Sequence, residues 1–463
     1  MNIPKNAQKG WKEYTTLVIC CTSVLLVGID MTAVNVALPT IDKDLQIGFS
    51  LLPWIIGAYT LPLAAFLMLS SSLADNLGRK RIFLLGLIIF LLGSALCGLA
   101  SNFTYLVIAR ALQGVGASML NPVAMAILAQ TFPATKDRAW AMGIWSGATG
   151  LALALGPLVG GLLVNSVLGW RYIFYINIPI GIIAILLTLW IISEKRPEKN
   201  QPFDVLGQIL MIIFLASLTY ALMEGETLGW GAWTIISAIG LACCTLVWFI
   251  FHQQKTPYPL LDLAFFRSMP FSLANVIAVL AFASLATFLY LNSLYLQQLR
   301  GFSAFRTGII LLPLAICSVI WGPINGRILS RKGSRIPLMV AGFGFTLTGL
   351  MLTVTDASTS LIWLALAYGL MGIANAAVGA PITYMAISGM PAAKTSLAAG
   401  ISSTSRQIGQ TLGVAITGMM MSRVQEGNLT SLGSAIIQGW WIMGLYGGMI
   451  LLLGLVTTRK QRL

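Results

Sequence analysis

Two charged side chains stand inside otherwise apolar stretches of this sequence, Asp30 in GIDMTAVNVALP and Arg110 in LVIARALQGVGA. A lone charge in a hydrocarbon layer is costly, so such residues usually pair with each other or mark a path for ions or protons. Burial favours a neutral carboxyl group, whereas a nearby guanidinium favours the carboxylate. A change in the distance between Asp30 and Arg110 would therefore bind and release a proton. The alternative is an ion pair that only locks two helices together.

Apolar stretches like these recur along the whole chain. They are fourteen in number and fall at residues 14–38, 51–71, 82–100, 104–128, 139–165, 171–193, 204–223, 232–252, 271–296, 306–329, 336–354, 360–386, 396–422 and 434–457. Most are long enough to cross a hydrocarbon layer of ~30 Å as helices. We therefore expect an all-α membrane protein with fourteen transmembrane helices. Asp30 lies in the first and Arg110 in the fourth, which run in opposite directions and bring the two residues to similar depth.

Lys and Arg collect in every second connection between the stretches. The sequence has 28 Lys and Arg against 14 Asp and Glu, a net charge of +14, and most of these cations fall on one side. The positive-inside rule then predicts a multi-pass protein of the cytoplasmic (inner) membrane with both termini in the cytoplasm. Topology and attraction to anionic lipid explain the charge, and nucleic acid is not an expected partner. Residues 1–14 lack a small-residue cleavage site, so we expect the first helix to remain as an anchor.

The chain also repeats itself. SSLADNLGRKR (71–81) is echoed by GRILSRKGSR (326–335), which aligns Gly78 with Gly333, and a glycine pattern in the fifth stretch recurs in the thirteenth. We therefore predict two pseudo-symmetric six-helix bundles, at residues 1–200 and 259–463. The stretches within residues 201–258 have no counterpart and are predicted to form an inserted two-helix hairpin. Paired bundles around a site at mid-membrane depth are typical of alternating-access transporters.

Several motifs, in order along nearly the whole chain, resemble those of one family. SSLADNLGRKR resembles the loop between helices 2 and 3 of the major facilitator superfamily, with Ser71 where glycine is usual. LVIARALQGVGA resembles the helix 4 motif, and GATGLALALGPLVGG (147–161) resembles the helix 5 motif of antiporters. GIDMTAVNVALP, WRYIFYINIPIG (170–181) and SSTSRQIGQTLG (402–413) are similar to the fourteen-helix drug:proton antiporters of the EmrB/QacA type. The resemblance implies the major facilitator fold and proton-coupled efflux.

A second set of residues is expected to form gates and a hinge. Gly78 would allow a tight reversal, neighbouring cations would sit among lipid headgroups, and the glycines of the fifth stretch would allow close helix contact at a hinge. Ordinary small-residue packing is the alternative for these glycines. The set comprises Asp75, Gly78, Arg79, Arg81, Gly147, Gly150, Gly156, Pro157, Gly160, Gly161, Arg331, Gly333 and Arg335. Asp75 is expected against the start of the thirteenth helix, whereas the equivalent Ser330 is neutral.

Other polar or aromatic side chains are candidates for lining a substrate cavity. They are Asn35, Trp54, Tyr59, Gln113, Asn292, Tyr295, Asn375, Tyr384 and Arg406. Interhelical hydrogen bonds or an interfacial aromatic belt are the alternative for each, and Arg406 could instead snorkel to the headgroups. Glu224 and Glu226 fall at the outer end of the seventh stretch, where we expect them to be solvated.

Asp30 is the only carboxylate that the sequence embeds firmly in the twelve core helices. We therefore expect proton-coupled efflux of lipophilic, neutral or monocationic drugs; a proton-coupled transporter of a metabolite, peptide or sugar is the alternative. The single histidine and six cysteines show no catalytic or metal-binding spacing, so an enzyme, a metal and a cofactor are not expected. GMPAAKTS (389–396) lacks the second glycine of a phosphate-binding loop. The expected partners are a small molecule, protons and the bilayer; we expect a monomer and leave a periplasmic adaptor open.

Overall fold

The computed structural model describes residues 10–132, 135–165, 167, 169–194, 203–388, 395–422, 424 and 429–457, though not the side-chain surroundings of some residues in α5 and at the start of α15. Every element within these ranges is helical. The elements are α1 (Gly10–Leu45), α2 (Leu52–Leu77), α3 (Arg79–Gly98), α4 (Phe103–Thr131), α5 (Thr135–Val164), η1 (Gly169–Arg171), α6 (Tyr172–Tyr175), α7 (Asn177–Ile191), α8 (Val205–Leu228), α9 (Trp233–Lys255), η2 (Leu263–Arg267), α10 (Met269–Leu294), η3 (Tyr295–Leu299), α11 (Ala304–Ile310), α12 (Leu312–Lys332), α13 (Arg335–Thr353), α14 (Leu361–Ile387), α15 (Thr395–Met421) and α16 (Leu429–Val456).

Within the described residues, twelve helical segments are long and apolar enough to cross a membrane. Short elements join into single segments, so that η1, α6 and α7 count together, as do α11 and α12. Two other long helices, α5 and α15, are not among the twelve, although α5 contains the apolar stretch Leu155–Val164. In α15 the polar run at 402–407 lowers the mean hydropathy. An all-helical, multi-pass membrane architecture is thus confirmed, whereas the expected count of fourteen spans is not.

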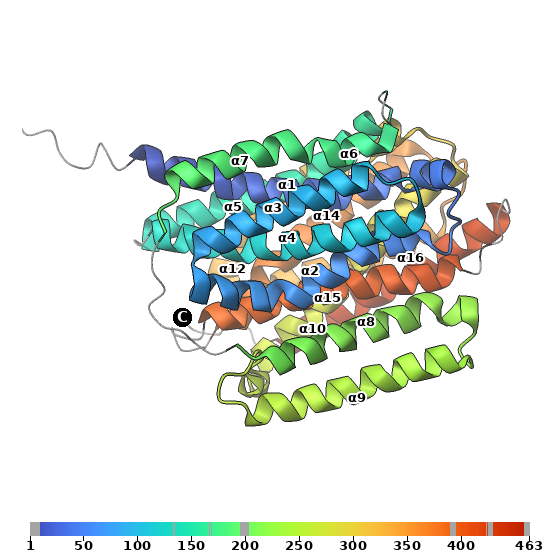
Figure 1. The fold of residues 1–463 in the computed structure, drawn as a ribbon. Coiled ribbons are helices and arrows are strands. Elements are labelled where there is room, and N and C mark those ends of the chain that lie inside the picture. Colours follow the sequence, from blue (N-terminus) through green and yellow to red (C-terminus); the bar gives the residue numbers. More distant parts are fainter. Residues whose placement is uncertain are drawn as a thin grey trace, which may run out of the picture.

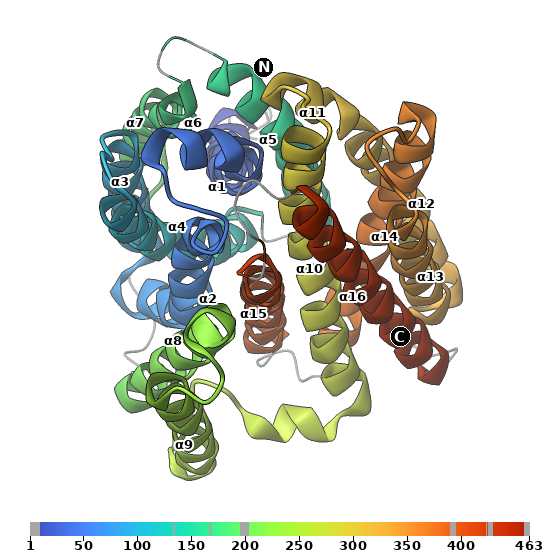
Figure 2. The same ribbon diagram turned by 90° about the vertical axis from the view of Figure 1, so that its right-hand side faces the viewer.

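The helices form two groups that lie side by side (Figures 1 and 2). Helices α1 to α7 pack around one another, with α4 against α1, α2 and α3. Helices α10 to α16 repeat this arrangement, with α14 against α10, α12 and α13. The two groups also contact each other, because α5 packs on α11 and α12, α15 packs on α2, and α1 packs on α10 and α11. We call the end of the bundle where α1 begins and α16 ends the terminal end, and the opposite end the far end.

The two groups are in close contact near the far end. A Cβ atom placed on Gly308 of α11 would lie 2.5 Å from the carbonyl oxygen of Pro157 in α5, so only glycine permits this approach. Gly161 of α5 meets the backbone of Ala304 in the same way, and the Gln297 side chain donates a 2.7 Å hydrogen bond to the carbonyl of Val36 in α1. Small residues therefore allow backbone to pack directly on backbone across the two groups.

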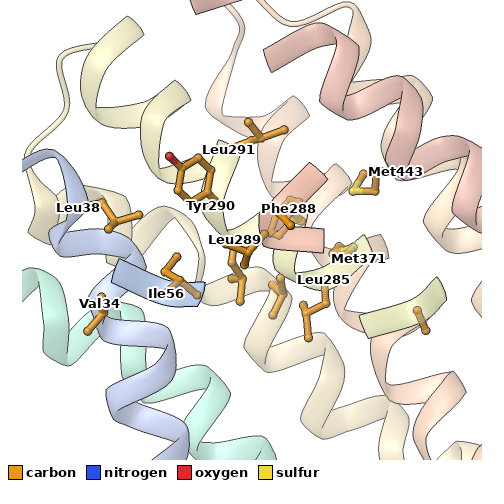
Figure 3. Packing of buried hydrophobic residues seen from close by; sticks show 14 of the residues in the cluster. Val34, Leu38, Ile56, Leu285, Phe288, Leu289, Tyr290, Leu291, Met371 and Met443 are labelled. Atoms are coloured by element: carbon orange, nitrogen blue, oxygen red, sulfur yellow. The ribbon is translucent and has the colours of Figure 1, made fainter. Parts of the chain in front are cut away.

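Apolar side chains fill the rest of this contact. Val34 and Leu38 of α1 and Ile56 of α2 belong to the same buried cluster as Leu285 and Leu289 of α10 (Figure 3). Burial of such side chains is the main favourable contribution to packing where they leave water, and their dispersion contacts contribute in lipid as well. The far end is thus held by a continuous core that both groups share.

Nearer the terminal end, two glycines show no such contact with any described residue. A Cβ atom on Gly147 of α5 or Gly400 of α15 would meet no atom within 4 Å, and Gly147 is exposed. The glycines of α5 that lie closer to the far end, Gly156 and Gly160, instead meet Thr32 and Ala33 of α1. Among the described residues, the two groups are therefore in close contact at the far end, with space beside Gly147 and Gly400 nearer the terminal end.

Helices α8 and α9 form a hairpin along one edge of the bundle (Figure 1). At its base, Asp204 caps α8 by accepting a 2.8 Å hydrogen bond from the Gly207 amide. The same carboxylate accepts hydrogen bonds from His252 at 2.6 Å, Gln253 at 2.5 Å and the Leu260 amide at 3.3 Å. This network ties both helices of the hairpin to the segment that leads into α10.

The hairpin contacts both helix groups through α8. Helix α9 packs mainly on α8, but α8 packs on both α2 and α15. Met223 of α8 lies against Gly57 of α2, where a Cβ atom would be 2.5 Å from its Cε, and also approaches Gly418 of α15. The expectation that Glu224 is solvated is wrong, because its half-buried carboxylate accepts a 2.7 Å hydrogen bond from the Trp54 indole. This indole needs a partner where the two helices bury it, and the glutamate provides one.

Candidate functional site

Asp30 and Arg110 meet inside the α1–α7 group. Arg110 Nη1 lies 2.6 Å from Asp30 Oδ2, and the two side chains are 1% and 0% exposed. Arg110 Nε also donates to the carbonyl oxygen of Ile55 in α2 at 3.1 Å. The predicted contact between the first and fourth helices is thus confirmed. A charge-assisted hydrogen bond of this length is among the stronger polar interactions available to buried side chains.

The second oxygen of the Asp30 carboxylate is bound by two side-chain amides. Gln113 Nε2 of α4 donates to Oδ1 at 2.9 Å, and Asn177 Nδ2 of α7 donates to it at 3.1 Å. Both amides also donate to the hydroxyl of Ser94 in α3, at 3.1 and 2.9 Å. Ser94 in turn donates to the carbonyl of Phe174 at 3.1 Å. The carboxylate therefore stands at the centre of a buried network built from α1, α3, α4 and α7.

Arg110 is held by aromatic rings as well as by oxygen atoms. Its guanidinium lies 4.2 Å from the ring centre of Tyr59 in α2 and 5.7 Å from that of Phe174. Its Nη1 atom also donates to Gln113 Oε1 at 2.7 Å. An aromatic face attracts a cation most strongly where water is excluded. The buried Tyr59 hydroxyl makes no hydrogen bond within the described residues, so Tyr59 contacts Arg110 through the face of its ring.

Glycines set the spacing that this network requires. A Cβ atom on Gly93 of α3 would lie 2.6 Å from the backbone nitrogen of Gln113, so α3 and α4 approach closely where Ser94 reaches the amide. Gly114 of α4 lies against the carbonyl of Tyr59, which brings α2 onto α4 beside Arg110. The small residues of the helix 4 motif thus position the site and do not themselves take part in its chemistry.

The network surrounds one buried carboxylate with three donors. Arg110, Gln113 and Asn177 all donate to Asp30, and only Arg110 among them carries a charge. Without the Arg110 contact, the carboxylate would keep neutral donors only. Within the described residues, no group of three or more His, Cys, Asp and Glu side chains could hold a metal ion.

Sequence reasoning did not select Ser94 or Asn177. Asn177 stands in the apolar run WRYIFYINIPIG, and a lone amide in such a run is a signal that could have identified it. Ser94 follows Gly93 in an apolar stretch and offers a weaker signal, because a serine in a membrane helix can bond its own backbone. Of the predicted cavity residues, Gln113 and Tyr59 belong to the network.

The other cavity candidates of the α1–α7 group lie apart from the network. Asn35 is buried and donates to the carbonyl of Met31 in its own helix at 2.9 Å. Trp54 is bound to Glu224 of α8. Neither residue contacts Asp30, so the structure does not bring these predicted residues together.

The candidates of the α10–α16 group are also dispersed. Tyr368 of α14 donates to the buried Asn292 of α10, and Tyr295 donates to the carbonyl of Asp356 at 2.7 Å. Asn375 is half-buried in α14, and Tyr384 lies near the end of that helix at the terminal end. These side chains stabilise the second group and have no counterpart of the Asp30 carboxylate among them.

Arg406 of α15 contacts α14 and α10 of its own helix group. Its Nη2 atom donates to the hydroxyl of Thr383 at 2.5 Å and to the carbonyl of Gly379 at 3.2 Å, both in α14. Its guanidinium also lies 5.6 Å from the ring centre of Phe282 in α10. Two neutral acceptors and a ring therefore contact this cation, while its Nε atom makes no hydrogen bond to any described residue.

At the terminal end, Asp75 pairs with Arg79 of the next turn at 3.0 Å, and Arg79 donates to the carbonyl of Ala126 at 2.8 Å. Arg81 lies 3.7 Å from Glu194. Gly78 and Gly333 have φ angles of 106° and 76°, which suit glycine. The expected contact of Asp75 with the start of the thirteenth helix involves Lys394, which lies outside the described residues, as do the surroundings of Gly150.

Comparison with known proteins shows what this arrangement resembles. The family model of the Major Facilitator Superfamily matches residues 20–414. The multidrug resistance protein Stp of Mycobacterium tuberculosis is 34% identical over 410 residues, which is 89% of this chain and 76% of that protein. The tetracenomycin C resistance and export protein of Streptomyces glaucescens is 33% identical over 91% of this chain and 78% of its own length. The methylenomycin A resistance protein of Bacillus subtilis is 32% identical over 88% and 87%.

Solved structures agree on the fold. A crystal structure of the nucleoside transporter NupG superposes with a TM-score of 0.69 at 13% identity and covers 96% of this chain and 99% of its own. A peptide transporter, POT, gives a TM-score of 0.69 at 16% identity, with 96% and 93% covered. At these identities the likeness concerns the fold alone.

Proposed function

Because the chain belongs to the major facilitator superfamily, we propose that it exports drugs from the cytoplasm in exchange for protons, with Asp30 as the proton carrier. The observation that carries this proposal is the Asp30 carboxylate itself, fully buried and bound by Arg110, Gln113 and Asn177. Relatives named for multidrug resistance, tetracenomycin C export and methylenomycin A resistance support drug efflux as the activity.

The same carboxylate suggests the substrate class. Asp30 has its counter-ion in Arg110, so the network as a whole offers no excess negative charge to a highly charged cation. Release of Arg110 would expose one negative charge, which suits a monocation, whereas the intact pair with Arg110 has no net charge, which suits a neutral compound. We therefore propose lipophilic, neutral or monocationic drugs as substrates.

We propose that the protein has fourteen transmembrane helices, as in the fourteen-helix drug:proton antiporters. We infer that α5 and α15 also cross the membrane, since each is long and packs between the two helix groups. The terminal end is cytoplasmic by the distribution of Lys and Arg. The six-helix bundles then occupy residues 1–200 and 259–463 and the hairpin 201–258, and the described state faces the cytoplasm.

Coupling follows if protonation and drug binding favour opposite conformations. A ligand shifts a conformational equilibrium only by its difference in affinity for the two states. A proton that reaches Asp30 from outside would cancel its charge and weaken the bond to Arg110, which would then be free to bind elsewhere. Each proton that moves inward supplies ~2.3 kcal/mol per 100 mV of membrane potential and ~1.4 kcal/mol per unit of pH difference.

Transport in vesicles tests the direction. Everted membrane vesicles that contain the protein should accumulate a fluorescent monocationic dye when their interior is acidified, and an uncoupler should abolish this accumulation. A transporter that imports a metabolite, peptide or sugar with protons would instead leave the dye outside under the same gradient. That result would favour the alternative function over drug export.

A further inference from the structure

A cavity of about 170 Å³ lies at the terminal end where α10, α13, α14 and α16 meet. Much of its wall is apolar, with Leu273, Met385 and Val456 among the residues that line it. Its volume is several times the ~30 Å³ that one water molecule occupies in the liquid. The cavity is far from the Asp30 network, which belongs to the other helix group.

The polar side of this cavity is the beginning of α13. Ser334 lines the cavity, is 7% exposed, and its hydroxyl makes no hydrogen bond to any described residue. It also does not cap its own helix. The first backbone N–H groups of a helix have no partner within it, and here Pro337 leaves Arg335 and Ile336 as the donors of the first turn. A buried hydroxyl and a helix N-terminus thus face the same small space, and an anion would satisfy both.

In the first helix group, the internal repeat places an anion at the N-terminus of α3, which is the counterpart of α13. Gly78 precedes α3 as Gly333 and Ser334 precede α13, and α7 packs on α3 as α16 packs on α13. At Gly78 the carboxylate of Glu194, which follows α7, lies directly against the glycine and 3.7 Å from Arg81. The first group therefore carries its own anion at this helix N-terminus.

Among the described residues, the second group places no such anion in the wall of the cavity. None of the described residues that line the cavity is acidic, and the sequence has no Asp or Glu after Glu426. Cations flank Gly333 and Ser334 in the chain: Arg331 and Lys332 are exposed at the end of α12, and Arg335 is half-buried at the start of α13. These side chains add positive charge to the positive N-terminal end of α13.

We propose that this cavity binds the phosphate of an anionic phospholipid. The Ser334 hydroxyl and the first amides of α13 contact the phosphate oxygens, the cations attract the net charge, and the apolar wall receives the start of an acyl chain. Basic pockets between membrane helices on the side of the positive loops are suited to such headgroups. The lipid would supply to α13 the negative charge that Glu194 supplies to α3.

Lipid binding to the purified full-length protein tests this proposal. Native mass spectrometry should detect a retained phosphatidylglycerol, and phosphatidylcholine or inorganic phosphate should not displace it. Ser334→Asp places a carboxylate in the cavity and should weaken phosphatidylglycerol binding by about tenfold, the size expected for a charge at a helix terminus. Because Asp is a favourable residue at the start of a helix, this variant should remain folded.

Ser330→Asp is the matched control, since it adds the same charge one turn earlier at an exposed position that does not line the cavity. It should leave phosphatidylglycerol binding within about twofold of the unmodified protein, as expected for a screened surface charge. Equal losses in the two variants would overturn the site and assign the effect to surface charge. Displacement of the lipid by inorganic phosphate would overturn the lipid as ligand in favour of a soluble anion.

Discussion

Asp30 of α1 and Arg110 of α4 are 2.6 Å apart at a position where neither side chain is more than 1% exposed. Removal of one partner of such a pair leaves an uncompensated buried charge, which is strongly destabilising. The network around them shows how the protein avoids this, because Gln113 and Asn177 also bind the carboxylate and two aromatic rings face the guanidinium. Each charge thus has further partners if the other moves away.

Asn177→Leu should slow dye efflux in vesicles severalfold. The substitution removes one of the three side chains that donate to the Asp30 carboxylate, and a hydrogen bond to a charged group contributes about 1.5–3 kcal/mol. Initial rates of dye efflux measure this effect. Asn35→Leu is the control, since Asn35 bonds its own helix in the described state, and an equal loss of rate there would contradict a positioning role for Asn177.

Gly161→Val should disfavour closure of the far end. In the described state Gly161 lies directly on the backbone of Ala304, and a side chain there would force α5 and α11 apart. Paired spin labels across the far end should therefore report a shift towards longer distances, with slower efflux. Gly240→Val in α9 has no atom within 4 Å and should change neither distance nor rate. An unchanged far-end distance in the Gly161 variant would remove this contact from the gate.

Charges in membrane helices could be predicted from the sequence more reliably than neutral polar contacts. Asp30 and Arg110 interrupt apolar runs at a large energetic cost, so each needs a partner, and antiparallel helices bring them to one depth. Burial of the neutral side chains of Asn177 and Ser94 in a membrane costs less than burial of a charge, and either side chain could have faced any neighbouring helix. Their contacts depend on helix rotations that the sequence does not define. The sequence predicts that Glu224 is solvated, because its partner, Trp54, lies 170 residues away and no local pattern indicates the contact.

The contact of Glu224 predicts a functional role for the inserted hairpin. Glu224→Leu should leave the Trp54 indole without its acceptor, loosen α8 from α2 and lower drug resistance severalfold. An unsatisfied buried donor costs about 1–3 kcal/mol, so the thermal midpoint of the purified protein should also fall. Glu226→Leu is a close match, because Glu226 binds an indole too, that of Trp230 within the hairpin. Equal resistance in the two variants would mean that the hairpin only packs at the edge.

The base of the hairpin should depend on pH through Asp204. Burial raises the pKa of this carboxyl, but hydrogen bonds from the Gly207 amide, Gln253, His252 and the Leu260 amide outweigh it and leave the pKa below its usual value. A carboxyl group with a lowered pKa stabilises the folded state above its unfolded pKa of about 3.9 and loses this contribution as the pH falls further. Protection of the amides at the start of α8 against hydrogen exchange, taken relative to the intrinsic exchange rate at each pH, should therefore fall below about pH 4. In Asp204→Asn this protection should be lower at neutral pH and nearly independent of pH, and an unchanged acid response in that variant would contradict the assignment.

Proton release on drug binding is a direct test of Asp30 as the proton carrier. When a lipophilic monocation is added to the detergent-purified protein in weakly buffered solution, we expect acidification of the medium, because drug binding and protonation of Asp30 exclude each other. Asp30→Asn keeps the size of the side chain but cannot titrate, so it should bind the drug without releasing a proton. Proton release from the Asp30→Asn variant equal to that of the unmodified protein would contradict the assignment of Asp30 as the proton carrier.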